Sequence, residues 1–214
     1  MEDLFKVTNN KIDSCIKDLK MEIFTLRSDV QQIKEESKGK IDQQAASIET
    51  VRADVSYNTE RLAISENAND LLVSGVPYVS SENLTNITNA ISVALGYTER
   101  NIPLVQAKRL ARFPIQANAA PPIMIRFAFK CVRDEFYRRY LSSRNLSLTH
   151  LGFNMNQRIF IIENLTKEGR RIKNYAVKLK RSGKLFVVFT RDGCVYVKTV
   201  VDVEAGPVRS IHEL

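Results

Sequence analysis

The sequence IDSCIKDLKMEIFTLRSDVQQI, at residues 12–33, places apolar side chains alternately four and three residues apart. This average spacing of 3.5 residues keeps one apolar stripe facing a partner as two or more helices supercoil left-handedly. The pattern breaks near Gly39 and resumes at Ile41, as a four-residue stutter does. We therefore expect a long helix that continues weakly across the break and forms a coiled-coil oligomerisation segment at residues 1–66.

The expected contact positions of this coiled coil, called the seam below, share the heptad spacing. They are Ile12, Ile16, Leu19, Ile23, Leu26, Val30, Ile33, Ile41, Ile48, Val55 and Leu62, with Val51 between. β-Branched Ile16, Ile23 and Val30 alternating with leucines favour a dimer, whereas Ile12 and Ile33 at leucine-type positions favour a trimer. The pattern is compatible with either a dimer or a trimer. The alternative, a helix lying along its own globular domain, is less favoured because such helices seldom exceed about 25 residues.

Charge divides the chain at the same place. Residues 1–66 hold 10 basic and 13 acidic side chains, whereas residues 67–214 hold 22 and 11. Residues 100–191 alone hold 20 basic and 4 acidic side chains, too many for mutual ion pairing to neutralise. This excess favours a polyanionic partner, and nucleic acid most of all, over a merely solvated basic surface.

Several classes of protein are not expected. The sequence contains no run of 18 apolar residues, so we expect no membrane-spanning helix. The first residues lack the apolar core of a secretory signal. Cys15, Cys131 and Cys194 are scattered, which predicts reduced, buried side chains in a cytoplasmic or nuclear protein. The sequence contains no motif whose residue types and spacing are known to support catalysis or metal binding. We therefore expect no enzyme, no cofactor and no metal.

The first part of the basic region predicts a βαββαβ order. Apolar runs indicate strands at residues 71–76, 105–112, 123–129 and 158–162, and helical spacing indicates helices at residues 81–95 and 132–141. This is the order of the ferredoxin-like topology, which RNA-recognition modules share, and it gives a domain at residues 67–163. Inward positions are expected to be Phe127, Phe129, Val132, Phe136, Tyr140 and Leu141, with Arg133, Arg138 and Arg139 outward.

The last part predicts a smaller domain at residues 164–214. Thr166 can cap a helix that runs to about residue 180 with an apolar stripe at Ile172, Tyr175, Ala176 and Leu179. Residues 185–190 and 194–199 alternate around a turn at Asp192-Gly193, a strong hairpin signal. A helix plus a hairpin is too small to be comfortably stable alone, so we expect it to dock on the preceding domain. The predicted fold class is α+β.

Several short sequences occur in an order that is typical of one family. They are LVSGVP (72–77), KRLAR (108–112), PIMIRF (122–127), RDEF (133–136), RIFIIENLT (158–166), FTRDG (189–193) and VYV (195–197). Together they cover about residues 69–198 and follow a coiled coil. In these respects the chain resembles the first open-reading-frame protein of LINE-type non-LTR retrotransposons, in its insect and baculovirus FP-protein branch.

The resemblance implies an oligomer that carries an atypical RNA-recognition module and a small C-terminal domain and acts as a nucleic-acid chaperone on single-stranded RNA or DNA. Some relatives carry a zinc finger or a zinc knuckle, which this chain lacks, and the first strand offers no stacking aromatic residue. The phosphate-binding residues implied are Lys108, Arg109, Arg112, Arg126, Arg144, Arg158, Arg170, Arg171 and Lys173. We add Arg138, Arg139 and Arg191 to the same expected interface, since paired arginines suit bidentate phosphate contacts.

A second interpretation belongs to another class of function. The coiled coil and basic domains could form a structural scaffold, as in virion or nuclear assembly of the baculovirus FP type, whose partners are acidic proteins. Salt-sensitive affinity for generic single-stranded RNA would separate the two interpretations.

Overall fold

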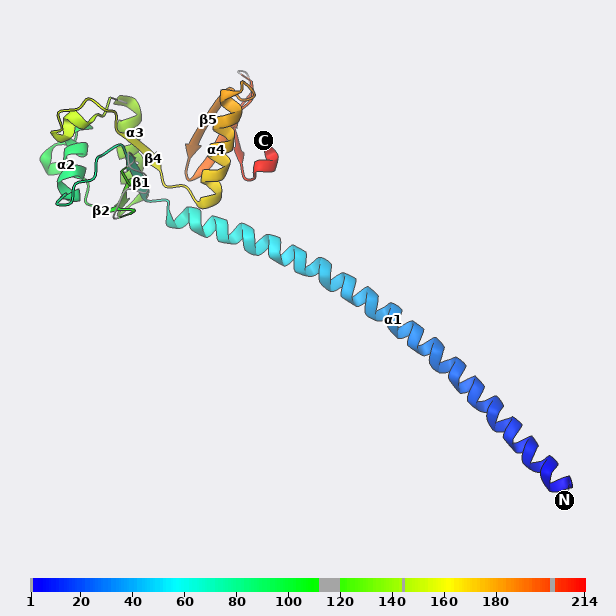
Figure 1. Ribbon diagram of the computed structural model, residues 1–214. Coiled ribbons are helices and arrows are strands. Elements are labelled where there is room, and N and C mark those ends of the chain that lie inside the picture. Colours follow the sequence, from blue (N-terminus) through cyan, green and yellow to red (C-terminus); the bar gives the residue numbers. More distant parts are fainter. Residues whose placement is uncertain (1, 112–119, 144, 201–202) are drawn as a thin grey trace. The chain divides into compact units, whose positions relative to one another are not determined.

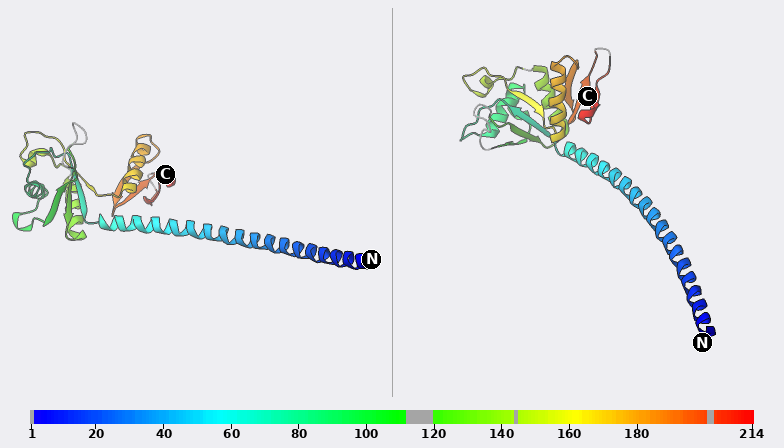
Figure 2. Two further views of the ribbon diagram at one scale, coloured as in Figure 1. Left: turned by 60° about the horizontal axis from the view of Figure 1, so that its bottom comes forward. Right: turned by 45° about the vertical axis from the view of Figure 1, so that its right-hand side comes forward.

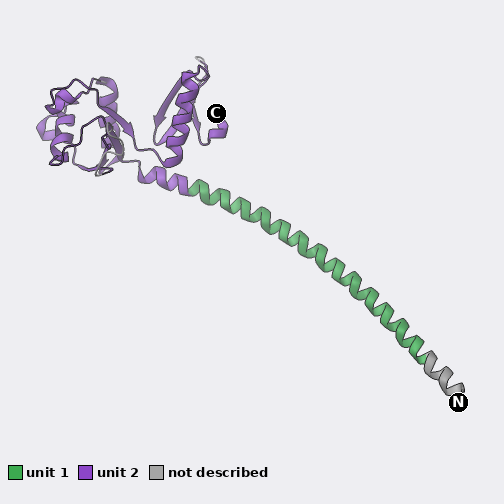
Figure 3. Cartoon of the chain, viewed as in Figure 1, with its two compact units in different colours: residues 1–58 green, residues 59–214 purple. Residues whose placement is uncertain are grey.

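The N-terminal helix α1 spans Glu2–Glu66 without interruption and passes through Gly39 (Figure 1). In this computed structural model, residues 2–111, 120–143, 145–200 and 203–214 are described, with side chains from Lys11 onward. The seam lies along α1 as a row of side chains between 43% and 66% exposed. The chain divides into two compact units, residues 1–58 and 59–214, so the last turns of α1 belong to the second unit (Figure 3).

The first sheet of the second unit has four strands in the order β2-β3-β1-β4, with every neighbouring pair antiparallel. The strands are β1 (Asp70–Ser74), β2 (Val105–Arg109), β3 (Ile123–Phe127) and β4 (Phe160–Glu163). Helix α2 (Leu84–Ala94) connects β1 to β2, and α3 (Lys130–Ser143) connects β3 to β4. The predicted order of six elements is therefore present, within an α+β fold. Short 3₁₀ helices lie at Glu99–Asn101, Leu148–Leu151 and Ile211–Glu213.

Alternation along the strands builds one core under this sheet. Every second residue of β1 and β3, such as Val73 and Ile125, is buried with Ile161 of β4 in the same cluster as Ile91 of α2 and Phe136 of α3. Both helices therefore cover one face of the sheet, and the side chains of the other face remain outside this core.

Three predicted side-chain positions in this module were wrong. Phe129 is exposed because β3 ends at Phe127. The side chain of Leu141, in the last turn of α3, is also exposed. Arg133, expected to point outward, is 3% exposed. Its position three residues before Phe136 and seven before Tyr140 puts it on the inward stripe of α3.

The second sheet has the order β5-β6-β7 and packs against α4 (Lys167–Arg181), as both views of Figure 2 show. The predicted hairpin is formed by β5 (Val187–Arg191) and β6 (Cys194–Lys198), and Thr166 caps α4 by accepting a hydrogen bond from the Gly169 amide. The third strand, β7 (Gly206–Val208), was not predicted. Tyr175, expected in the apolar stripe of α4, is exposed.

The cysteines are free. Cys15 and Cys131 are exposed and Cys194 is partly exposed, so the prediction of three buried thiols was wrong.

Candidate nucleic-acid interface

The face of the four-stranded sheet away from α2 and α3 carries some of the expected cations. Lys108 lies opposite Met124, whose neighbour on the next strand is Leu72, and this row crosses the sheet. On the edge strand, Phe160 is 49% exposed, and the guanidinium of Arg158 lies 5.3 Å from the centre of its ring. This face therefore combines separated positive charges with one exposed aromatic ring.

Arg126 stands on the same face but is already engaged. Its guanidinium donates hydrogen bonds of 2.7 and 2.8 Å to both carboxylate oxygens of buried Asp70, and this contact raises the pKa of Arg126. Half of its side chain stays exposed. Asp70 also accepts a hydrogen bond of 3.2 Å from the Asn164 amide. Arg126 is thus oriented by the sheet and keeps accessible N–H groups for an anion.

Arg109 serves the fold. Its side chain is 6% exposed and makes a bidentate ion pair with Glu82, at 2.6 and 2.5 Å. It also donates to the carbonyl oxygens of Val76, Pro77 and Pro121. Because these acceptors occupy its N–H groups, Arg109 is not part of an exposed cationic surface. Two other expected residues, Arg112 and Arg144, lie outside the described residues.

Arg138 and Arg139 lie on α3, which covers the opposite face of the sheet from Lys108 and Arg126. Both pair with Glu135 one turn away, and Arg138 stays largely exposed. Arg139 also donates to the Gly96 carbonyl oxygen at 3.1 Å and lies 4.2 Å above the Tyr97 ring. The expected set is therefore divided between two faces of the first module.

Helix α4 presents the densest row of exposed cations. Arg171 is 65% exposed and pairs with Glu168 at 3.0 Å, and Arg170 is exposed while donating to the Leu165 carbonyl oxygen at 3.0 Å. Lys178 and Arg181, which were not among the expected binding residues, extend this row, and exposed Tyr175 interrupts it. Lys178 lies seven residues after Arg171, which is two helical turns, and Arg181 lies three residues after Lys178, so the sequence already placed all three on one face of the helix.

Lys173 differs from its neighbours on α4. It is only partly exposed, and burial lowers the pKa of its ammonium while nearby Glu163 opposes that shift. The side chain therefore lies near the carboxylate of Glu163 rather than in the exposed row. Arg191, at the end of β5, is exposed, and its guanidinium lies 4.9 Å from the centre of the Tyr196 ring.

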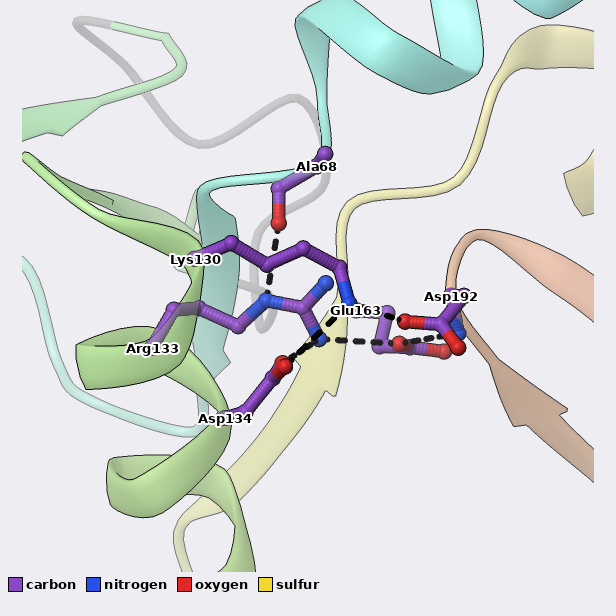
Figure 4. Close-up of polar contacts among 6 residues, drawn as sticks. All are labelled: Ala68, Lys130, Arg133, Asp134, Glu163 and Asp192. Atoms are coloured by element: carbon purple, nitrogen blue, oxygen red, sulfur yellow. Dashed lines mark hydrogen bonds and ion pairs between the residues drawn. The ribbon is translucent and has the colours of Figure 1, made fainter.

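The second unit contains two modules: the first is the four-stranded sheet with α2 and α3, and the second is the three-stranded sheet with α4. A polar cluster joins them (Figure 4). Arg133 of α3 donates to the Ala68 carbonyl oxygen at 2.8 Å and to the Glu163 carboxylate at 3.1 Å. The same carboxylate oxygen accepts the Asp192 amide at 3.0 Å, and Lys130 pairs with the Asp192 carboxylate at 2.6 Å. Arg133 and Glu163 are both nearly buried, at 3% and 4% exposure. This cluster fixes the hairpin turn on the first module.

The end of α1 adds to the same junction. Glu60 accepts a short hydrogen bond from the hydroxyl of Thr166, the cap of α4. A side chain added at Gly193 in the hairpin turn would come 3.0 Å from Ile64, so the turn packs closely on the last turns of α1. Charged, polar and apolar contacts therefore hold the second module against the first module and the last turns of α1.

Comparisons add no relative to this description: no family model matches the chain, and no curated protein matches it. Each helix in the described part of the chain is either too short or too polar to span a lipid bilayer. In the same residues, no group of three His, Cys, Asp or Glu side chains could hold a metal ion.

Proposed function

We propose that this protein is an oligomeric, largely sequence-independent single-stranded nucleic-acid-binding protein with nucleic-acid chaperone activity. The observation that carries the proposal is the exposed row on α4, with Arg170, Arg171, Lys178 and Arg181, in a region with 20 basic and 4 acidic side chains. Phosphates are the anions that such spaced guanidinium and ammonium groups bind best.

The four-stranded module supports the same proposal through its topology. The antiparallel sheet ordered β2-β3-β1-β4, with α2 and α3 on one face, supports our proposal that this module is ferredoxin-like. The sheet face away from the helices is where RNA-recognition modules contact a single strand. Here that face carries Lys108, Arg126 and the exposed Phe160, around the nearly buried Leu72 and Met124. The resemblance to LINE-type first open-reading-frame proteins, and a place in a retrotransposon-type ribonucleoprotein, belong to this proposal.

Self-association through α1 completes the proposal. An exposed seam of this length is expected to be covered by the seam of another copy as a coiled-coil dimer or trimer. Several copies of residues 59–214 on one oligomer would raise the affinity for a long strand through effective concentration. Weak contacts of this kind, made and broken independently, let strands exchange and anneal.

The test measures the affinity of the full chain for a mixed-sequence single-stranded RNA. Arg171→Ala with Lys178→Ala removes two exposed cations from α4 and spares Arg170, which donates to the backbone. Each lost charge-assisted contact is worth about 1.5–3 kcal/mol, so binding should weaken at least about tenfold.

The matched control is Lys17→Ala with Lys38→Ala, which removes the same charge from α1 at positions outside the seam. This control should bind as the unchanged protein does. Equal affinity for the two double variants would refute the role of α4, and binding to acidic proteins but not to RNA would favour the scaffold function.

A further inference from the structure

The three-stranded sheet has one face that the small core leaves uncovered. Val188, Val195, Val197 and Val208 face α4 and pack with Leu165 and Ile172. Because side chains alternate along a strand, Phe189, Arg191, Tyr196 and Lys198 lie on the other face. Phe189 is 38% exposed and Tyr196 is partly exposed, and neither belongs to the small core.

The two aromatic rings on this face form an ordered pair. Phe189 and Tyr196 are directly opposite in the ladder between β5 and β6. Their ring centres are 5.4 Å apart with planes 13° from parallel, and Arg191 lies 4.9 Å from the centre of the Tyr196 ring. Neighbouring strands thus fix the ring positions, so little conformational freedom would be lost when a flat ligand stacks on them.

Charge on this face selects the kind of flat ligand. The strands Val187–Arg191, Cys194–Lys198 and Gly206–Val208 contain the cations Arg191 and Lys198 and no acidic residue. In the adjoining turn, the Asp192 carboxylate is held by Lys130. A ligand with flat apolar rings and negative charges between them complements this arrangement, and an unpaired strand of nucleic acid has that chemistry.

We propose that Phe189 and Tyr196 form a stacking subsite for unpaired nucleobases, with Arg191 and Lys198 holding the adjoining phosphates. This inference rests on the proposed single-stranded nucleic-acid binding and deepens it, because it adds a contribution that depends on bases to one that depends on phosphates. Stacking tolerates any base, so the subsite leaves the binding largely independent of sequence.

The first experiment compares two ligands of equal length and charge: a single-stranded RNA and the same ribose-phosphate strand without bases. In the full chain, Phe189→Leu with Tyr196→Leu keeps apolar side chains on the sheet but removes both rings. It should weaken RNA binding at least about fivefold, since stacking contributes about 1–3 kcal/mol per base, and leave binding of the base-free strand unchanged.

Controls separate failure of the subsite from failure of the proposed function. Tyr196→Phe keeps the ring and should retain full RNA affinity, and Phe24→Leu alters an exposed ring on α1 and should change nothing. If the unchanged protein binds neither strand, the proposed function fails. If it binds both and the double leucine variant binds RNA equally well, only the stacking subsite is overturned.

A second readout does not depend on the stability of the leucine variant. The chain has no tryptophan, so Tyr196→Trp introduces a single fluorescent reporter at the proposed subsite. RNA should quench and shift its emission, whereas the base-free strand should leave it unchanged. Phe24→Trp on α1 should respond to neither ligand. Equal responses of the Tyr196→Trp reporter to both strands would contradict base stacking.

Discussion

The cations of this chain divide into those that hold the fold and those that remain available to a ligand. Arg109 and Arg133 belong to the first group, because buried carboxylates and carbonyl oxygens occupy their N–H groups. Arg171 belongs to the second group, with only an exposed partner one turn away. Net charge alone could not make this division, since it depends on which acidic residue each arginine meets in three dimensions.

Part of the junction was nevertheless predictable. Ile161 is buried in β4, and side chains of a strand alternate, so Glu163 had to point inward as well. A buried carboxylate calls for a cationic partner. The identity of that partner was not predicted, because the charge of Arg133 favours a solvent-facing position whereas its spacing from Phe136 and Tyr140 places it on the buried stripe.

We expect Glu163→Ala to be strongly destabilising. It removes the buried carboxylate of this pair and leaves the nearly buried guanidinium of Arg133 with the half-exposed Asp134 as its ion-pair partner. Breaking a buried pair typically costs about 3–5 kcal/mol, and we expect the lower end of that range because Asp134 remains. Urea unfolding of the full chain measures this loss when followed by tyrosine emission, because six of the seven tyrosines lie in residues 59–214. The control Glu168→Ala breaks only the exposed pair with Arg171 and should cost less than about 1 kcal/mol. Equal effects would mean that the buried pair does not stabilise the junction.

The Lys130–Asp192 pair should give a small, pH-dependent contribution. The hydrogen bond from Lys130 lowers the pKa of the Asp192 carboxyl in the folded state. Its contribution is therefore present above the unfolded pKa of about 3.9 and is lost as the pH falls through the lower, folded value. Both side chains are about half exposed, so solvent screening limits it to below about 1 kcal/mol.

Asp192→Asn tests this pair while respecting the backbone, because residue 192 has a φ of +55° and asparagine tolerates that conformation. The variant should unfold at lower urea concentration than the unchanged protein at pH 7. The difference should shrink as the pH falls below about 3.9. A difference that stays constant down to pH 2 would exclude ionisation of Asp192 as its cause.

At the scale of elements, periodicity carried most of the information. The long helix, the six elements of the first module, the Thr166 cap and the hairpin were all predicted, with ends that differ by a few residues. β7 was missed because it is three residues long and contains Pro207, which usually argues against a strand. It is possible here because β7 is an edge strand that pairs only with β6.

The seam of α1 makes a prediction about one element. Leu19→Asn with Leu26→Asn places amides in the seam and should abolish the self-association that we propose, leaving a monomer. In that monomer α1 has no packed face, and such a helix is only marginally stable in water. The ellipticity of the full chain at 222 nm should therefore weaken as well. Met21→Asn with Phe24→Asn changes two exposed apolar residues outside the seam and should leave the proposed self-association intact. Sedimentation equilibrium distinguishes these outcomes, and two identical profiles would contradict the coiled coil.

At the scale of the whole molecule, an acidic helical segment carries a strongly basic pair of modules. The 10 basic and 13 acidic residues of positions 1–66 contrast with 22 and 11 beyond them. We infer a division of labour in which α1 sets the number of copies and residues 59–214 contact the polyanion. Association through many exposed cations should release many counterions and should therefore depend steeply on salt.

The most direct measurement is the affinity of the full chain for mixed-sequence single-stranded RNA over a range of salt concentrations. If each copy contacts about 6 phosphates, the plot of log affinity against log salt should fall with a slope of about −4 per engaged copy. Scrambling the RNA sequence should leave the affinity nearly unchanged. A slope near zero, or no binding at low salt, would contradict nucleic-acid binding through the cationic surface of this protein.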